Sequence, residues 1–401
     1  MKFWAGDTIT QFTGQVTTLA LPTIAILTLN VTSFQLGLLN ALGFIAFPAL
    51  GLFAGVWIDR VRRRPVMILV NIVEFVTLAV IPITYLLGAL NLYELYAVSF
   101  IMGVGTLFFD VAYQSYLPSL VNKEDVVEGN QKLQVSASAS EVAGPSVASA
   151  LMAAFGAALS IIADVLGTLA AAISLALIRK PEPKPGKIQD RDFFAELRDG
   201  LKVVFGNKLL WTQAGSTATS NLGTNVFYVA LLLYAYRVLG ISKDVIGIAF
   251  SIGAVGFVAG VLAHSVVTKK LGFGRATALS TAIRFSDLFV LLAGPATGFY
   301  PIVVIGAALF ISSFGVPIYN INMVSLRQII TPNALQGRMN ATMRTIVWGT
   351  IPLGAFLGGI LATNIGLVPT LIVGALIGGS SVLWIILGPI VSLKKCPEPI
   401  K

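Results

Sequence analysis

Apolar segments fill most of the chain, and short polar stretches separate them. A bilayer span takes about 20 mainly apolar residues, and the segments have that length or slightly more. They predict twelve membrane-spanning helices, at residues 4–29, 34–57, 66–88, 93–118, 132–156, 158–178, 209–236, 243–267, 276–296, 299–326, 338–363 and 367–391. The pattern is therefore that of an all-α membrane protein.

One long polar stretch, at residues 179–208, divides these spans six and six. It predicts an N-terminal half at 1–178, a cytoplasmic linker at 179–208 and a C-terminal half at 209–401. The linker begins with a proline-rich run that cannot be helical. From Asp190 onward its apolar residues share one helical face, which predicts an amphipathic helix. This helix either lies on the inner membrane surface or packs on the cytoplasmic loops.

Composition supports the membrane assignment and narrows the chemistry. Only 11% of the residues are charged, against about 25% in a soluble domain, so a water-soluble protein is excluded. The single Cys396 and the single His264 exclude an internal disulfide and a multi-histidine metal site. The glycine-rich phosphate loop of ATP-driven pumps does not occur in this chain. We therefore expect neither a metal nor a cofactor.

Basic residues gather in alternate loops, which fixes the expected orientation. If both termini are cytoplasmic, nearly all Lys and Arg residues between spans lie on that side, and the opposite loops hold only Arg237 and Lys243. The net charge of +9 then reflects basic loops against anionic lipid headgroups. No compact basic domain suggests a nucleic-acid partner.

The two halves resemble each other at positions 209 residues apart. Gly51 corresponds to Gly260, Arg60 to Lys269, and residues 117–121 to 326–330. Repeated six-span halves imply a pseudo-twofold axis along the membrane normal, with a substrate site between the halves. Such a repeat is typical of transporters.

The loop after residue 54 carries a motif with a known counterpart. It reads Gly55-Val-Trp-Ile-Asp59-Arg60-Val-Arg62-Arg63-Arg64 and resembles the cytoplasmic motif of the major facilitator superfamily. Further segments are similar to its macrolide-efflux and siderophore-exporter branch of drug:proton antiporters: Trp4-Ala-Gly6, Ala20-Leu-Pro22, Phe109-Asp110, Gly144-Pro145, Asp164, Phe194 to Leu201, Gly337-Arg338 and Trp348 to Gly354. Two positions depart from that branch, where Gln15 replaces an acid and Ala148-Ser149 replace a glycine pair.

The resemblance implies a gating role for the loop motif. In the superfamily the acid of this motif lies near the amino end of span 11, where a helix dipole stabilises a carboxylate. Asp59, with Arg60 and Arg63, would thus latch the outward-facing state, and Asp110 would pair with one arginine. The alternative is a solvated basic loop. Gly144 and Pro145 would form a hinge where small residues let helices approach.

Acids inside spans are expensive and are candidates for carrying protons. Asp7, Gln11 and Gln15 share one face of the first helix, which lines the cavity in this superfamily. Glu141 lies one turn before Pro145. These two acids are our first candidates for proton coupling, with a structural hydrogen bond as the alternative for Glu141. Asp110 and Asp287 follow, although Asp287 stands three residues after Arg284 and predicts a structural ion pair. Glu74 is a poorer candidate because its helix is peripheral in the superfamily, and we expect Asp164 to be structural.

Uncharged polar residues form a long face on the span at 209–236. The candidate cavity residues there and on three other spans are Gln213, Thr217, Asn221, Asn225, Tyr228, Tyr113, Gln114, Tyr319, Asn320, Asn322, Gln11 and Gln15. Neutral donors and aromatic rings among apolar walls suit an amphiphilic organic molecule. Polar contacts between helices account for part of this face in the alternative interpretation, and His264 is expected to be structural.

Together these features predict a proton-coupled exporter of amphiphilic drug-, macrolide- or siderophore-like molecules, working by alternating access. We expect a monomer in the plasma (inner) membrane of a prokaryote. Uptake or uniport of a small neutral solute is one alternative, and a transport-dead membrane sensor or scaffold is another. An enzyme is disfavoured, because no nucleophile with a base and no metal set is visible.

Overall fold

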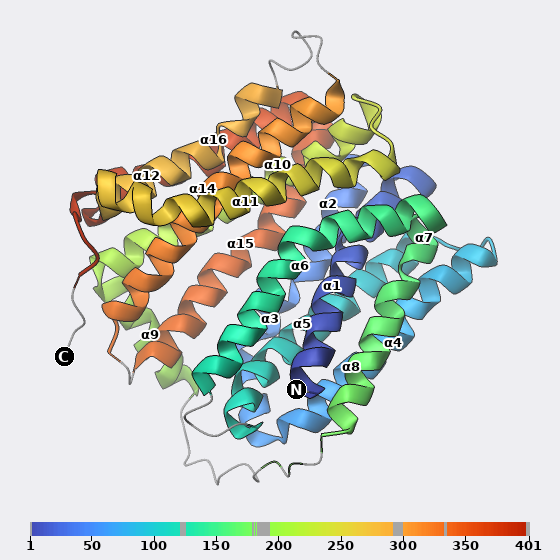
Figure 1. Cartoon of the computed structure of the whole chain (residues 1–401), viewed down its shortest axis with the longest axis horizontal. Helices are drawn as coiled ribbons and strands as arrows, with labels where there is room; N and C mark the ends of the chain where they lie inside the picture. Colours follow the sequence, from blue (N-terminus) through green and yellow to red (C-terminus); the bar gives the residue numbers. More distant parts are fainter. Residues whose placement is uncertain are drawn as a thin grey trace. The chain divides into compact units, whose positions relative to one another are not determined.

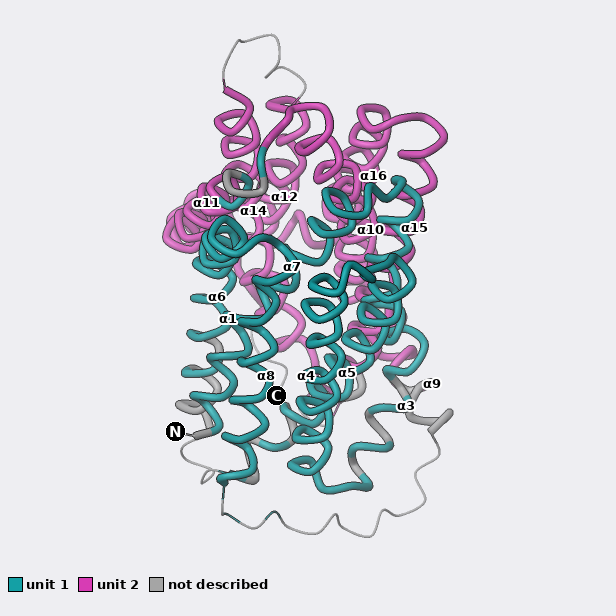
Figure 2. The backbone as a smooth tube through the Cα atoms, turned by 90° about the vertical axis from the view of Figure 1, so that its right-hand side faces the viewer, with its two compact units in different colours: residues 1–190, 242–247 teal, residues 191–241, 248–401 magenta. Residues whose placement is uncertain are grey.

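The computed structural model describes residues 2–120, 126–178, 180, 182, 193–291, 300–332 and 335–397, and this part is almost entirely helical. Eight of its helical segments are long and apolar enough to cross a membrane. The chain divides into two compact units (Figure 2). Unit 1 comprises residues 1–190 with 242–247, and unit 2 comprises residues 191–241 with 248–401.

Unit 1 is a bundle in which α1 occupies a central place. Its elements are α1 (Lys2–Thr23), the π-helical η1 (Ile24–Thr28), α2 (Ser33–Phe44), α3 (Ala46–Arg60), α4 (Arg63–Leu86), α5 (Leu92–Leu120), α6 (Val126–Phe155), α7 (Ala157–Ser160) and α8 (Ile162–Ala176). Helix α1 packs against α6 and α8, and α4 packs against α5 and α8 (Figure 1). Ser136 on α6 ties the first pair together, because its hydroxyl accepts from Trp4 Nε1 at 2.9 Å and lies 2.8 Å from Thr8 Oγ1.

Unit 2 is organised around one long helix, α10. Its elements are α9 (Phe193–Gly206), α10 (Lys208–Arg237), α11 (Lys243–Leu271), α12 (Phe273–Arg284), α14 (Pro301–Ile329), α15 (Gln336–Asn364), α16 (Leu367–Leu387) and the 3₁₀ turn η4 (Pro389–Ser392). Helix α10 packs against α15 and α16, while α12 packs against α14. The first residues of α11 fall in unit 1.

The predicted span at 34–57 is interrupted at Ile45, where α2 ends and α3 begins, while residues 33–51 together still form one apolar span. Pro48 explains the break: it lacks an N–H group, and its ring collides with the carbonyl of Phe44 in a continuous helix. A second break at Ile161 divides the predicted helix 158–178 into α7 and α8; the sequence does not explain it.

The predicted helix at 276–296 also differs. Helix α12 ends at Arg284, and Phe285 and Ser286 form a turn whose N–H groups donate to Ala282 and Ile283. Residues 287–291 are helical again, and 292–299 lie outside the described residues. This turn moves Asp287 off the helical face that the sequence assigned to it.

Helices α1, α6, α10 and α12, which correspond to four predicted spans, are not among the eight apolar ones. The first three are 22 to 30 residues long, so length is not what excludes them. Helices α1 and α10 carry polar residues that the sequence assigned to cavity-lining faces, and α6 carries Glu141, whereas α12 has only 12 residues. The twelve-span topology stays a prediction.

The linker helix α9 packs against the protein. It contacts α15 and α10, and its Val204 is fully buried in a core cluster with Leu210 and Met339. Phe205 is 51% exposed, with its ring 4.7 Å from that of Trp211. Helix α9 thus buries part of its apolar face on α10 and α15, and its contact with the inner membrane surface stays a prediction. The proline-rich run before it lies outside the described residues, except for Lys180 and Glu182.

Candidate functional site

Asp7 is a buried acid on α1 without a hydrogen bond. Its side chain is 4% exposed, and neither carboxylate oxygen has a hydrogen-bonding partner. Gln11 and Tyr113 nevertheless lie close enough to act on the group as donors, and Asp110 is the charged residue that acts on it. An unpaired charge is costly in such surroundings.

Aromatic rings close the space beside Asp7. The Tyr113 ring lies 5.4 Å from the ring of Phe3 and 6.0 Å from that of Phe109. Phe3 also meets Tyr116 edge-on at 5.5 Å. These contacts join the start of α1 to α5 and fix the orientation of Tyr113 toward Asp7.

Three more of the intramembrane acids named from the sequence lie on other helices of unit 1. Asp110 on α5 is close enough to act on both Asp7 and Glu74, and Asp164 on α8 acts on Glu74. Glu74 and Asp164 are 9% and 2% exposed. The structure buries Glu74 against Gly105, where an added Cβ would lie 2.6 Å from Glu74 Oε1, and its lower rank as a coupling candidate stays a prediction.

Asp164 differs from Asp7 in having a donor. Thr17 Oγ1 on α1 donates to Asp164 Oδ2 at 2.5 Å. The structural role expected for Asp164 agrees with this contact, which joins α8 to α1.

The predicted hinge on α6 is a close contact with α1. Gly144 is buried beneath Gln15, whose Cβ would lie 2.7 Å from a Cβ added at Gly144. Pro145 lies inside a continuous helix. Four residues beyond it, Ser149 Oγ accepts from the N–H of Gly247 at 3.2 Å. Gln15 thus packs against α6 at this point.

Two other proton-coupling candidates have different surroundings from those expected. Glu141 is exposed, so the structure does not bury it beside Pro145. The predicted pairing of Arg284 with Asp287 stays a prediction: the two charges act on each other, while each side chain also bonds to another group. Arg284 Nη2 donates to Thr224 Oγ1 at 3.2 Å, and the buried Asp287 accepts from the N–H of Leu288 at 2.9 Å.

In unit 2, much of the predicted polar face on α10 forms hydrogen bonds to neighbouring helices. Tyr319 on α14 places its hydroxyl 2.7 Å from Thr217 Oγ1 and 3.3 Å from Ser216 Oγ. Gln213 Nε2 donates to the carbonyl of Met323 at 3.0 Å, and Asn221 Nδ2 donates to that of Val347 at 3.1 Å. The alternative of polar contacts between helices therefore accounts for these residues.

The remaining cavity candidates in unit 2 divide into two groups. Asn322 is buried and structural, since His264 Nε2 donates to its Oδ1 at 2.9 Å and its Nδ2 donates to Thr277 Oγ1 at 3.0 Å. Asn225 donates to the carbonyl of Asn221 at 2.8 Å. Tyr228 packs its ring 6.2 Å from that of Phe250, and Asn320 is exposed. The structural role expected for His264 is therefore supported.

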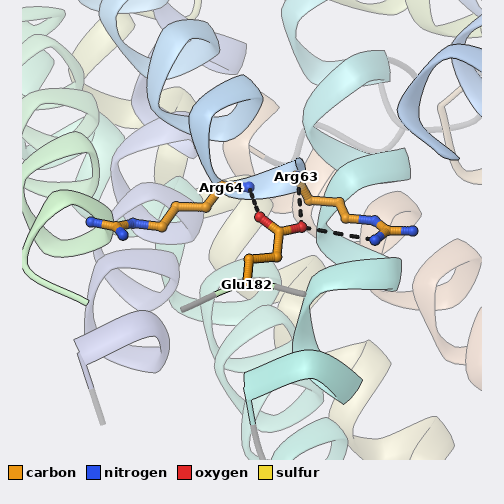
Figure 3. A network of polar contacts seen from close by, with 3 residues as sticks. All are labelled: Arg63, Arg64 and Glu182. Carbon is orange, nitrogen blue, oxygen red and sulfur yellow. Dashed lines mark hydrogen bonds and ion pairs between the residues drawn. The ribbon is translucent and has the colours of Figure 1, made fainter. Parts of the chain in front are cut away.

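The arginines of the loop motif form a network with the linker (Figure 3). The carboxylate of Glu182 accepts hydrogen bonds from the backbone N–H groups of Arg63, at 2.7 Å, and Arg64, at 3.1 Å. Arg63 Nη1 lies 3.8 Å from the same carboxylate. Arg64 donates from Nε to the carbonyl of Leu175 at 2.9 Å and from Nη2 to that of Ala176 at 2.7 Å. Glu182 therefore caps the start of α4, and Arg64 caps the end of α8.

Sequence reasoning missed Glu182, although a signal was present. Helix α4 begins with Arg63-Arg64-Pro65, has an arginine as its N-cap residue and has no acid in its first turn. The free N–H groups at a helix start need an acceptor, which here comes from the linker. Arg60 is exposed. The side chains of Asp59 and Gln114, and the surroundings of Gly55, lie outside what the structure describes.

No group of three or more His, Cys, Asp or Glu side chains within the described ranges is placed to hold a metal ion.

Comparison with known proteins agrees with these features. The family model of the Major Facilitator Superfamily matches residues 3–350. Macrolide efflux protein A of Streptococcus pyogenes is 27% identical over 374 residues, covering 90% of this chain and 89% of that protein. The protein of the same name from Enterococcus faecalis is 26% identical over 326 residues, covering 79% and 97%.

A solved structure shares the fold. The crystal structure of a bacterial homologue of the iron transporter ferroportin, in an inward-facing state, has a TM-score of 0.78 at 16% identity and covers 98% of both chains. The family match extends over most of the chain, from α1 into α15. The chain therefore belongs to the Major Facilitator Superfamily and is a membrane transporter, not an enzyme.

Proposed function

We propose that the protein exports amphiphilic organic molecules of the macrolide class from the cytoplasm, in exchange for protons, by alternating access. The observation that carries the coupling is the buried carboxyl group of Asp7, whose oxygens have no hydrogen-bonding partner. A group of this kind can bind a proton when it is secluded and release it when water reaches it, so that one proton moves per cycle.

The substrate class rests on the relatives and on the uncharged residues of unit 2. Two relatives aligned over most of their length are macrolide efflux proteins. Arg284 and Arg344 are the basic residues deepest in the predicted spans; Arg284 bonds to Thr224, and Arg344 stacks over the Trp348 ring at 4.4 Å. Engaged cations and neutral donors favour a large, weakly charged molecule over a strongly anionic metabolite.

We also propose a membrane topology for the chain. Twelve spans in two six-helix halves, at 1–178 and 209–401, would lie in a prokaryotic plasma membrane with both termini in the cytoplasm. The distribution of Lys and Arg supports this orientation. Asp59 would serve as the cytoplasmic latch, and a monomer would be the working unit.

Purified protein in liposomes tests the function. Under an imposed pH gradient, vesicles with the acidic side on the extracellular face of the protein should take up a radiolabelled macrolide from the cytoplasmic face. Siderophores and cationic dyes serve as further substrates. A proton ionophore should abolish accumulation.

Two results would contradict the proposal. Accumulation of a small neutral solute such as a sugar, with no response to macrolides, would indicate an uptake carrier. Absence of transport of every compound, by folded protein that binds a macrolide, would indicate a sensor or scaffold.

A further inference from the structure

A cavity at the start of α4 is not used by the transport mechanism. Its volume is about 490 Å³, and Arg62, Arg64, Pro65, Ile68, Leu69, Ile72 and Glu182 line it. All of these residues belong to unit 1. The apolar span at 63–86 begins at the same place, so the cavity lies where the span meets the polar loop.

The arginines in this cavity offer positive charge to a ligand. Arg62 is exposed, and its guanidinium makes no hydrogen bond or ion pair with the described residues. Arg64 uses Nε and Nη2 on the carbonyls of Leu175 and Ala176, which leaves its Nη1 donors for another acceptor. Guanidinium groups bind phosphate oxygens well because their donors match that geometry.

The acid in the cavity is already engaged. Glu182 has a side chain that is 3% exposed and lies near three donors of Arg63 and Arg64. It therefore neither neutralises Arg62 nor offers a free carboxylate to an ammonium group. This arrangement favours a headgroup with net negative charge over a zwitterionic one.

The other wall of the cavity leads along the apolar surface of α4. Leu69 and Ile72 are 58% and 45% exposed, and Val76, Val80 and Ile83 continue the stripe at helical spacing. From Leu69 to Ile83 the stripe measures about 21 Å at 1.5 Å per residue. One leaflet of the hydrocarbon core is about 15 Å thick, so an acyl chain can follow the stripe over its full depth.

We propose that this cavity binds an anionic phospholipid of the phosphatidylglycerol type. The lipid phosphate lies against Arg62 and Nη1 of Arg64, and one acyl chain lies along Leu69, Ile72 and Val76. Free phosphate would use the same arginines but not the apolar stripe, which is why we favour the lipid. This inference does not depend on the transported substrate or on proton coupling.

Native mass spectrometry of the full-length protein in detergent tests the proposal. Phosphatidylglycerol, phosphatidylethanolamine and phosphatidylcholine with identical acyl chains are added in equal amounts. We expect phosphatidylglycerol to be retained preferentially. Arg62→Gln should weaken its binding about fivefold, since a basic side chain near the headgroups contributes about that factor. Leu69→Trp, which narrows the cavity without changing charge, should weaken it as well.

Arg275→Gln is the matched control. Arg275 is exposed and lies in the first turn of α12 in unit 2. Its replacement by Gln changes the net charge by the same amount as Arg62→Gln. This control variant should leave lipid binding unchanged. Equal retention of the three lipids, or an equal loss in Arg275→Gln, would overturn the proposal. Displacement of the lipid by millimolar inorganic phosphate at constant ionic strength would instead indicate a site for small anions and also overturn it. Thermal unfolding of each variant verifies that it is folded.

Discussion

The hydroxyl oxygen of Tyr319 on α14 lies 2.7 Å from Oγ1 of Thr217 on α10. Both residues are on faces that the sequence assigns to the substrate. In the structure they bond to each other, and Tyr319 is only 4% exposed. Polar residues inside a bundle of helices thus serve first to join the helices, and this changes which substitutions should affect binding.

Tyr319→Phe should lower stability rather than substrate affinity. The variant removes the hydroxyl that contacts Thr217 and Ser216, at a cost of about 1 kcal/mol, as for a typical buried hydrogen bond. Unfolding of the purified protein in mixed micelles measures this. Asn320→Ala, at an exposed neighbour, should leave stability unchanged. Weaker macrolide binding by Tyr319→Phe with unaltered stability would show that the hydroxyl contacts substrate.

Gly144→Ala should separate α1 from α6. The added methyl group would lie 2.7 Å from Gln15 Cβ, which is far inside van der Waals contact, and overpacking of this kind costs about 1–3 kcal/mol. Gly14→Ala is the matched control on α1, because nothing lies within 4 Å of a Cβ added there. We expect a lower melting temperature for the first variant only. Equal stability of the two would mean that α1 and α6 pack less closely than the structure indicates.

Asp7→Asn should uncouple transport from protons. The amide cannot titrate, so accumulation driven by a pH gradient should disappear, while downhill exchange of substrate persists. Both modes are measured in liposomes. Asp164→Asn is the comparison variant. Asp164 already accepts a hydrogen bond from Thr17, so its replacement should lower the stability of the protein and leave proton coupling intact. If Asp7→Asn retains full pH-driven transport, the coupling group must be sought among Glu141, Asp110 and Asp287.

Cys396 reports the orientation of the protein. As the single cysteine, it should react with a membrane-impermeant maleimide only after the cells are permeabilised. In a Cys396→Ser background, Asn91→Cys should react from outside. External labelling of Cys396 in intact cells would reverse the topology.

The labelling rate of Cys396 should also depend on pH. Partial burial raises the pKa of its thiol, so the reactive thiolate is scarce at neutral pH. The rate should keep rising beyond the ordinary thiol pKa of about 8.5. A plateau near that pH, measured in permeabilised cells, would show that the thiol is fully solvated.

Short-range pattern predicted the helices well where composition alone decides them. Runs of about 20 apolar residues correspond to α4, α5 and α14 within a few residues. It did not predict the interruptions at Ile45 and at Phe285–Ser286, where a proline and a turn break the helix. The length and periodicity of an apolar run do not show where a backbone hydrogen bond is lost inside the helix.

The sequence by itself determined the membrane class and the superfamily, because these follow from composition, spacing and motif. Only the tertiary structure decided which polar groups are already engaged: Tyr319 with Thr217, Thr17 with Asp164, and Glu182 with the start of α4. It also decided that Asp7 is left without a hydrogen bond. The reason is physical: periodicity tells which side chains share a face of one helix, but a hydrogen bond depends on the atom that the neighbouring helix brings within about 3 Å.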